Sequence, residues 1–252
     1  MPTSEQRLVA LVQGPSRWHS IEHVPTTSST NDLARELTEA GTGPGLVVLA
    51  ETQTEGRGRA GRAWLDQPGG DLLVSVTTGI PSGEETLVPL AAGLAIADAV
   101  RRHGLHVSLK WPNDVLAGGR KLAGVLVERL EDALVIGIGV DIDWRDVDRS
   151  GELTAWTSMA EETGADVDRW DVLTDLLRSL DTWLRDLDQG DAERLLAQYQ
   201  LDCSTIGQQV VVTTPAGDVV EGRAIGLDAT GALGVDTADG PIAVIAGDVT
   251  VR

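Results

Sequence analysis

Residues 107–142 read VSLKWPNDVLAGGRKLAGVLVERLEDALVIGIGVDI. Gly118-Gly119 and Glu131-Asp132 are turn residues, and they interrupt runs that are rich in Val, Leu and Ile. Apolar runs separated by short turns are typical of antiparallel β-hairpins. We therefore predict neighbouring strands at 107–111, 115–117, 121–130 and 133–142.

The flanking sequence predicts further strands and several helices. Strands are expected at 21–24, 45–51 and 71–78, and helices at 5–13, 86–102, 157–163, 167–186 and 191–201. The hydroxyl residues 27–30 precede apolar residues at helical spacing and Gly41, which predicts a helix capped by a hydroxyl group. The fold class is therefore α+β, with a mixed, largely antiparallel sheet and flanking helices.

The sequence after Cys203 differs from the rest of the chain. It consists of short β-rich runs separated by Gly, Asp and Pro turns, at 209–214, 219–227, 233–236 and 242–245. This pattern is typical of a small β-barrel. We expect a catalytic or binding domain over 1–202 and a small β-domain over 203–252.

Composition limits the class of protein. The 252 residues include 20 basic and 39 acidic side chains, for a net charge of −19, which argues against binding to nucleic acid or to an anionic membrane. Cys203 is the only cysteine, so no intrachain disulfide forms. The N-terminus has no signal pattern, and no apolar run approaches the ~20 residues of a membrane span. We expect a cytoplasmic protein.

The stretch 51–64 combines arginine with glycine. Arg57, Arg59 and Arg62 alternate with glycines that let a backbone approach a ligand. Arginine forks suit phosphate or carboxylate groups, and a glycine-rich loop can enclose and release such an anion. RNA binding is the alternative. The acidic chain and the single nearby aromatic residue, Trp64, favour a small anionic ligand.

Lys110 and Lys121 are the only lysines, and both lie in the hairpin segment. An ammonium is a compact, mobile charge that can follow a phosphate or carboxylate oxygen through a reaction, which the broader guanidinium does less well. Lys121 begins an apolar strand, so its charge is expected close to the sheet. Asn113 and Asp114 follow Trp111-Pro112 and are also explained by turn chemistry.

These motifs, taken in order, resemble the biotin–protein ligase family. The matching elements are Ser29-Thr30-Asn31, the G-R-G-R-x-G-R-x-W loop over 56–64, K-W-P-N-D over 110–114, R-K-L-A-G-V-L-V-E over 120–128, and a small C-terminal β-domain. The motifs cover about residues 1–140. The resemblance implies a catalytic domain similar to class II aminoacyl-tRNA synthetases and an SH3-like C-terminal barrel.

The resemblance also implies a two-step reaction. The biotin carboxylate attacks the α-phosphate of MgATP, giving biotinyl-5′-adenylate and pyrophosphate. A lysine of a biotin carboxyl carrier domain then attacks the mixed anhydride and releases AMP. The implied partners are biotin, ATP with Mg²⁺, and the carrier domain.

Site residues follow from matching the motifs position by position. Lys121 and Arg59 are the expected catalytic residues. Biotin or its adenylate is expected to contact Ser29, Thr30, Asn31, Gln53, Gly56, Arg57, Gly58, Arg59, Lys121 and Gly124. ATP is expected to contact Arg62, Trp64, Lys110, Asn113 and Asp141, with Asp114 as the metal ligand. Asp141 stands where the family pattern has asparagine, which bears on nucleotide affinity or selectivity.

Several alternatives remain at this point. A lipoate or octanoate ligase or transferase has a related fold, but its arginine-serine-triple-glycine segment is absent here. A non-catalytic biotin-binding regulator would bind biotin without releasing pyrophosphate. About 25 residues precede the first ligase motif, too few for a winged-helix domain, so we expect no operator binding. The chain is expected to be a monomer or a homodimer.

Overall fold

A computed structural model describes residues 6, 9–10, 16–81, 84–148 and 150–251. The helix predicted at 5–13 lies mostly outside this part of the chain, and its described residues, Gln6, Val9 and Ala10, are helical. Among the described residues, no helix has the length and apolar character needed to cross a membrane.

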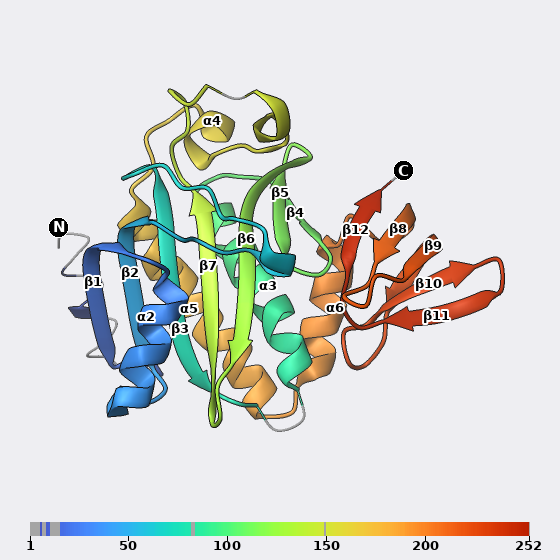
Figure 1. Cartoon of the computed structure of the whole chain (residues 1–252), viewed down its shortest axis with the longest axis horizontal. Helices are drawn as coiled ribbons and strands as arrows, with labels where there is room; N and C mark the ends of the chain where they lie inside the picture. The colour runs from blue at the N-terminus through green and yellow to red at the C-terminus, as the bar shows by residue number, and fades with distance from the viewer. Residues whose placement is uncertain (1–5, 7–8, 11–15, 82–83, 149, 252) are drawn as a thin grey trace.

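A seven-stranded sheet forms the centre of the molecule (Figure 1). Its spatial order is β1-β2-β3-β7-β6-β5-β4, with β1 parallel to β2 and every other neighbouring pair antiparallel. The strands are β1 (Ser20–Thr27), β2 (Leu46–Gln53), β3 (Asp71–Gly79), β4 (Val107–Lys110), β5 (Asp114–Ala117), β6 (Arg120–Arg129) and β7 (Ala133–Asp141). The predicted α+β class and the hairpins of 107–142 are confirmed.

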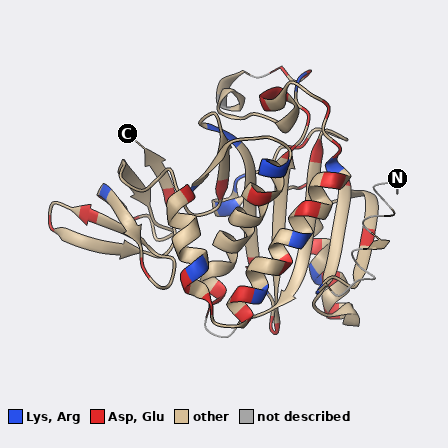
Figure 2. Cartoon of the chain, turned by 180° about the vertical axis from the view of Figure 1, so that it is seen from behind, with Lys and Arg blue, Asp and Glu red and all other residues tan. Residues whose placement is uncertain are grey.

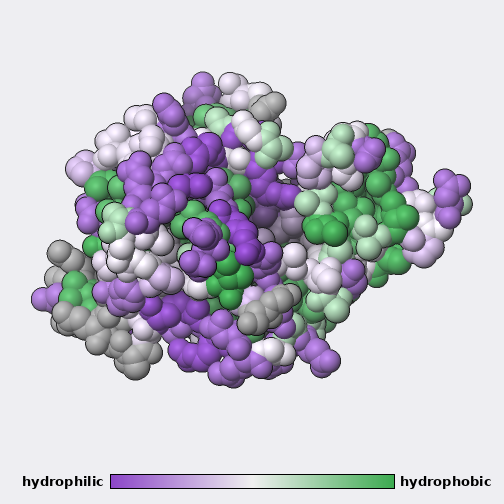
Figure 3. Space-filling model, turned by 60° about the horizontal axis from the view of Figure 1, so that its bottom comes forward, coloured by the Kyte–Doolittle hydropathy of each residue, from purple (hydrophilic) through white to green (hydrophobic). Residues whose placement is uncertain are grey.

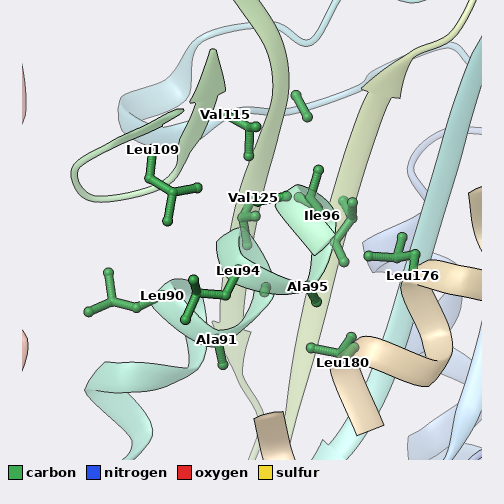
Figure 4. Packing of buried hydrophobic residues seen from close by; sticks show 14 of the residues in the cluster. Leu90, Ala91, Leu94, Ala95, Ile96, Leu109, Val115, Val125, Leu176 and Leu180 are labelled. Atoms are coloured by element: carbon green, nitrogen blue, oxygen red, sulfur yellow. The ribbon is translucent and has the colours of Figure 1, made fainter. Parts of the chain in front are cut away.

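Helices cover both faces of this sheet. They are α2 (Thr30–Leu37), α3 (Val88–Arg102), α4 (Met159–Thr163), α5 (Arg169–Asp188) and α6 (Ala192–Asp202). The largest core lies between one face and the α3–α5 pair, and Figure 4 shows Leu94 and Ile96 of α3, Val125 of β6 and Leu176 of α5 among its side chains. Acidic and basic residues are interspersed along the outer helices (Figure 2), where Arg185 pairs with Asp181.

Alternation along the strands divides side chains between the two faces. Leu134, Ile136 and Ile138 of β7 join the α3–α5 core. Val135 points to the opposite face, where it packs beneath Ala34 of α2. The same alternation places Gly137 and Gly139 on the α2 face. Beyond α2 this face therefore has little side-chain bulk of its own, and this is where the arginine-rich loop crosses it.

The start of α2 corrects the prediction of a hydroxyl cap. Ser29 occupies the N-cap position, but its side chain accepts no capping hydrogen bond. Instead, Gln53 Oε1 at the end of β2 accepts from the Thr30 backbone N–H at 2.8 Å and from Thr30 Oγ1 at 3.0 Å. Because β2 ends beside the helix start, a long amide side chain from the sheet replaces the local hydroxyl.

A second, five-stranded antiparallel sheet follows α6 (Figure 1). Its order is β11-β10-β9-β8-β12, with strands β8 (Gln209–Thr213), β9 (Val219–Leu227), β10 (Leu233–Thr237), β11 (Gly240–Val244) and β12 (Asp248–Val251). The sequence did not predict the four-residue β12. Val219 and Ile225 of this sheet are large apolar residues that are exposed. Figure 3 shows a hydrophobic surface on the right of the molecule.

Candidate functional site

A cavity of about 780 Å³ lies on the α2 face of the main sheet. The start of α2, the loop after β2 and the strands β5, β6 and β7 form its walls. It brings together 14 of the residues predicted from the sequence: Ser29, Thr30, Asn31, Gln53, Arg57, Gly58, Arg59, Arg62, Trp64, Lys110, Asn113, Asp114, Lys121 and Gly124. Residues as far apart in the chain as Ser29 and Gly124 therefore meet at one site.

Glycines on β6 and β7 create room in this cavity. Gly124 and Gly139 are directly opposite each other in the antiparallel register. A Cβ at Gly139 would overlap the Trp64 indole, and one at Gly137 would overlap the Asn31 amide. Sequence reasoning did not assign Gly137 or Gly139 to the site. The Gly-Ile-Gly alternation within an apolar strand was the available signal, since glycine there often marks close approach of another group.

Lys121 projects into the cavity between an acid and two aromatic rings. Its Nζ lies 2.8 Å from Asp114 Oδ1. It also lies 5.3 Å from the Trp64 ring centroid and 5.1 Å from that of Trp156. Cation–π attraction and the ion pair together restrict where the ammonium can lie. Trp156, which sequence reasoning missed, reaches the cavity from the segment after β7.

The three loop arginines have different environments. Arg57 forms a forked pair with Asp32 at 2.7 and 2.6 Å, and this pairing lowers the pKa of the Asp32 carboxyl. Arg59 is more enclosed, and burial lowers the pKa of its guanidinium. Its Nη1 donates to Asn113 Oδ1 at 3.2 Å. Arg59 is thus held toward Asn113, in the turn between β4 and β5, as a cation already partly removed from water.

A buried polar network supports the start of α2. Ser75 Oγ on β3 lies 2.7 Å from Thr30 Oγ1 and donates to Asn31 Oδ1 at 2.6 Å. Asn31 Nδ2 donates to Glu128 Oε2 at 2.7 Å. Sequence reasoning did not identify Ser75 or Glu128, because their partners lie far away in the chain. The network fixes the Thr30 and Asn31 side chains at the cavity wall.

The charge of the cavity is opposite to that of the chain. Its described lining contains Arg57, Arg59, Arg62, Lys110 and Lys121 but a single carboxylate, Asp114. An anionic ligand is favoured where fixed cations converge in an enclosed site. The described residues contain no group of three or more His, Cys, Asp or Glu that could hold a metal. Asp114 and the Asn113 amide oxygen are nonetheless hard donors of the kind Mg²⁺ uses together with substrate phosphates.

Two predicted residues, Gly56 and Asp141, lie outside the cavity wall. Asp141 is fully buried opposite Asp71, two positions along β7 from Gly139. Its contact with ATP stays a prediction, and in this geometry its carboxylate lies beneath the surface of the site. Gly56 is buried at the base of the loop, where its carbonyl accepts from the Trp64 N–H at 2.9 Å.

Asp71 supports the aromatic wall from behind. Its Oδ1 accepts from Trp144 Nε1 at 2.6 Å, and the Trp144 ring stacks on Trp156 with centroids 5.8 Å apart. Burial raises the pKa of the Asp71 carboxyl to about 7. A chain of contacts thus runs from a buried acid through Trp144 and Trp156 to Lys121.

Comparisons with known families match both parts of the chain. The biotin/lipoate A/B protein ligase family model matches residues 23–143. The model of the biotin protein ligase C terminal domain matches residues 205–252.

Individual proteins resemble the chain over most of its length. A biotin–[acetyl-CoA-carboxylase] ligase of Mycobacterium tuberculosis is 34% identical over 95% of this chain and 91% of that protein. The bifunctional ligase/repressor BirA of Escherichia coli is 31% identical over 85% of this chain and 68% of its own length. The biotin protein ligase of Aquifex aeolicus, solved with biotin and ATP, has a TM-score of 0.81 and 28% identity, covering 93% of this chain and 99% of that one.

Proposed function

The chain belongs to the biotin/lipoate A/B protein ligase family, and we propose that it is a biotin–protein ligase. It uses ATP to attach biotin to a lysine of a carrier domain, through biotinyl-5′-adenylate. The observation that carries this proposal is Lys121, whose ammonium is held by Asp114 and two indole rings in a cavity lined by four other cations. The names of the similar ligases support the same substrates.

The first step brings two anions together. The biotin carboxylate attacks the α-phosphorus of ATP, an O–P bond forms, and pyrophosphate leaves. Negative charge accumulates on the phosphoryl oxygens, so preorganised cations aimed at them lower the barrier. Lys121 and Arg59 supply these cations, and Lys121 moves from Asp114 toward the phosphate. Arg62, Lys110 and Asn113 bind the remaining phosphates.

A bound Mg²⁺ would neutralise part of the phosphate charge. Asp114 is the protein ligand that we propose for it, since Mg²⁺ in nucleotide sites typically uses one or two carboxylates together with the phosphates. Movement of Lys121 toward the α-phosphate frees the Asp114 carboxylate. The same ion pair that positions Lys121 before binding then provides the oxygen donor for the metal.

In the proposal, the polar wall of the cavity binds biotin and the aromatic wall binds the base of ATP. We assign the uncharged ring of biotin to Ser29, Thr30, Asn31 and Gln53, which offer hydroxyl and amide groups at the α2 end of the cavity. The planar base of ATP suits the face of Trp156. In the second step the acceptor lysine attacks the acyl carbon and AMP leaves. The loop carrying Arg57, Gly58 and Trp64 keeps water from the anhydride.

Residues 1–202 form the catalytic domain and 203–252 the smaller one, a division supported by the C-terminal family model that begins at residue 205. The enzyme acts in the cytoplasm, binds no nucleic acid and is a monomer or homodimer.

The test is transfer of biotin to a biotin carboxyl carrier domain, followed by intact mass spectrometry. The protein is incubated with MgATP and either biotin, lipoate or octanoate. A biotinyl mass gain is expected, with no gain from the other two acids. A lipoyl or octanoyl gain without a biotinyl gain would replace this function with the related one. Biotin binding without pyrophosphate release would identify a regulator instead.

The Lys121→Ala variant tests the proposed role of the Lys121 ammonium in adenylate formation. Loss of one preorganised cation from a transition state typically costs about 100- to 1,000-fold in rate, and we expect the rate of adenylate formation to fall by at least the lower figure. Arg120→Ala is the matched control, since Arg120 pairs with Glu162 at 2.9 Å beside the site and takes no part in the proposed chemistry. Equal rates in the two variants would remove Lys121 from its role.

A further inference from the structure

The arginine-rich loop is fastened to the C-terminal sheet. Arg62 Nη2 donates to Asp248 Oδ1 at 2.6 Å, and Arg59 Nη1 reaches the Gly247 carbonyl at 3.5 Å. Figure 1 shows the loop crossing in front of β7 and β6 toward this sheet. We call the Arg62–Asp248 ion pair the clasp. It joins a residue in the wall of the cavity to the first residue of β12.

The Asp248 side of the clasp is rigid. Asp248 is paired with Thr213 in the β12–β8 ladder. The preceding Gly247 packs so closely on β8 that a Cβ there would lie 2.5 Å from Val212 Cγ1 and 2.9 Å from the Thr213 carbonyl oxygen. The corner cannot shift without disturbing β8. Asp248 is therefore a fixed anchor.

The Arg62 side is a short hairpin whose tip, residues 60–63, is exposed. Gly58 N–H donates to the Arg62 carbonyl at 2.7 Å, and Trp64 N–H donates to the Gly56 carbonyl at 2.9 Å. Its tip includes Ala60 in the left-handed region, at φ 55°. Backbone held in this region by surrounding contacts is common where a segment changes conformation. The exposed tip of the hairpin can move, whereas its anchor cannot.

The Asp248 carboxylate offers Arg62 the same kind of oxygen acceptor as the phosphates of ATP. A guanidinium fork donates hydrogen bonds to carboxylate and phosphate oxygens in the same geometry. We propose that Asp248 is a positioning residue that holds Arg62, and with it the loop, across the cavity while no phosphate chain is bound. The triphosphate takes Arg62 from Asp248, and release of pyrophosphate returns it. This inference rests on the proposed function, because it assigns Arg62 to the phosphates of ATP.

The clasp is weak enough to exchange. The two side chains are 63% and 44% exposed, and exposed pairs contribute little to stability. A highly charged triphosphate competes easily with one such carboxylate. The clasp therefore closes the loop over biotin before ATP arrives and over the adenylate after pyrophosphate leaves. In this way the C-terminal sheet biases the loop toward its closed position over the cavity.

The direct test is hydrogen–deuterium exchange of the 56–64 peptide in the ligand-free protein. Asp248→Asn removes the charge and should increase exchange in this peptide, whereas Asp248→Glu should keep it close to that of the native protein. Asp239→Asn, an exposed change in the turn between β10 and β11, is the matched control. Because this readout needs no catalysis, it remains valid if the proposed function fails. Unchanged exchange in Asp248→Asn would overturn the clasp.

A kinetic test separates the clasp from a merely structural role. In Asp248→Asn, ATP no longer competes with a carboxylate for Arg62, so the KM for ATP should fall by about two- to fivefold, the range expected for one exposed ion pair. The kcat should stay within about twofold of the native value. Without a carrier domain, the looser loop should raise the rate of adenylate hydrolysis by a similar factor. A KM that rises, or a kcat that falls with KM unchanged, would contradict the exchange of Arg62.

Discussion

Gly139 shows how much the site depends on a missing side chain. Trp64 occupies the space where a Cβ of residue 139 would stand, and its indole then faces Lys121. We predict that Gly139→Ala displaces Trp64 and lowers the affinity for biotin or ATP at least tenfold, about 1.4 kcal/mol. Isothermal titration calorimetry with each substrate measures the effect.

Gly79→Ala is the control for this change. Gly79 ends β3, and a Cβ there would meet nothing within 4 Å. It should leave both affinities unchanged. If Gly139→Ala binds both substrates as the native protein does, the indole does not need this position for binding.

At the scale of one element, α2 depends on a residue outside itself. Gln53 Oε1 accepts from both the backbone and the hydroxyl of Thr30, in place of the expected local cap. Loss of a helix N-cap typically costs about 1 kcal/mol. Gln53→Ala should therefore lower the free energy of unfolding by about that amount, as measured by urea denaturation.

The conservative variant distinguishes the hydrogen bond from simple packing. Gln53→Glu keeps an acceptor oxygen of the same reach, so it should retain most of the stability lost in Gln53→Ala. If both variants lose equally, the amide acts through its volume and not as the cap of α2.

At the scale of the whole molecule, Asp71 makes stability depend on pH. Burial raises its pKa from 3.8 to about 7 in the folded protein, so the folded state binds this proton more tightly than the unfolded chain does. The free energy of unfolding should therefore fall as pH rises from about 4 to about 7, by as much as a few kcal/mol. The nearby Asp66 acts in the same direction on this pKa.

Urea denaturation at pH 5 and pH 8 tests this expectation. Asp71→Asn cannot ionise, so the difference between the two pH values should shrink relative to the native protein. Asp239→Asn, exposed in the turn between β10 and β11, should show the native difference. An undiminished difference in Asp71→Asn would assign the pH dependence to other groups.

Local patterns in the sequence were enough for much of the fold. Turn residues between apolar runs predicted the hairpins of 107–142, because strand alternation and turn preference are properties of neighbouring residues. The four-residue β12 was missed because it pairs with the distant β8 and not with the neighbouring β11, so no hairpin pattern announces it in the sequence. The cap of α2 was predicted wrongly because its acceptor comes from a strand 23 residues away in the chain.

Most of the chemistry of the site could also be predicted from the residue types. Clustered arginines, the two lysines and the resemblance to biotin–protein ligases predicted 14 residues that line one cavity. Tertiary structure alone decided what surrounds them. Trp156, Ser75, Gly137 and Gly139 acquire their positions from sheet register and from contacts between distant segments, which no short motif encodes. The clasp between Arg62 and Asp248 spans 186 residues of sequence, so only the packing of the two sheets could bring it together.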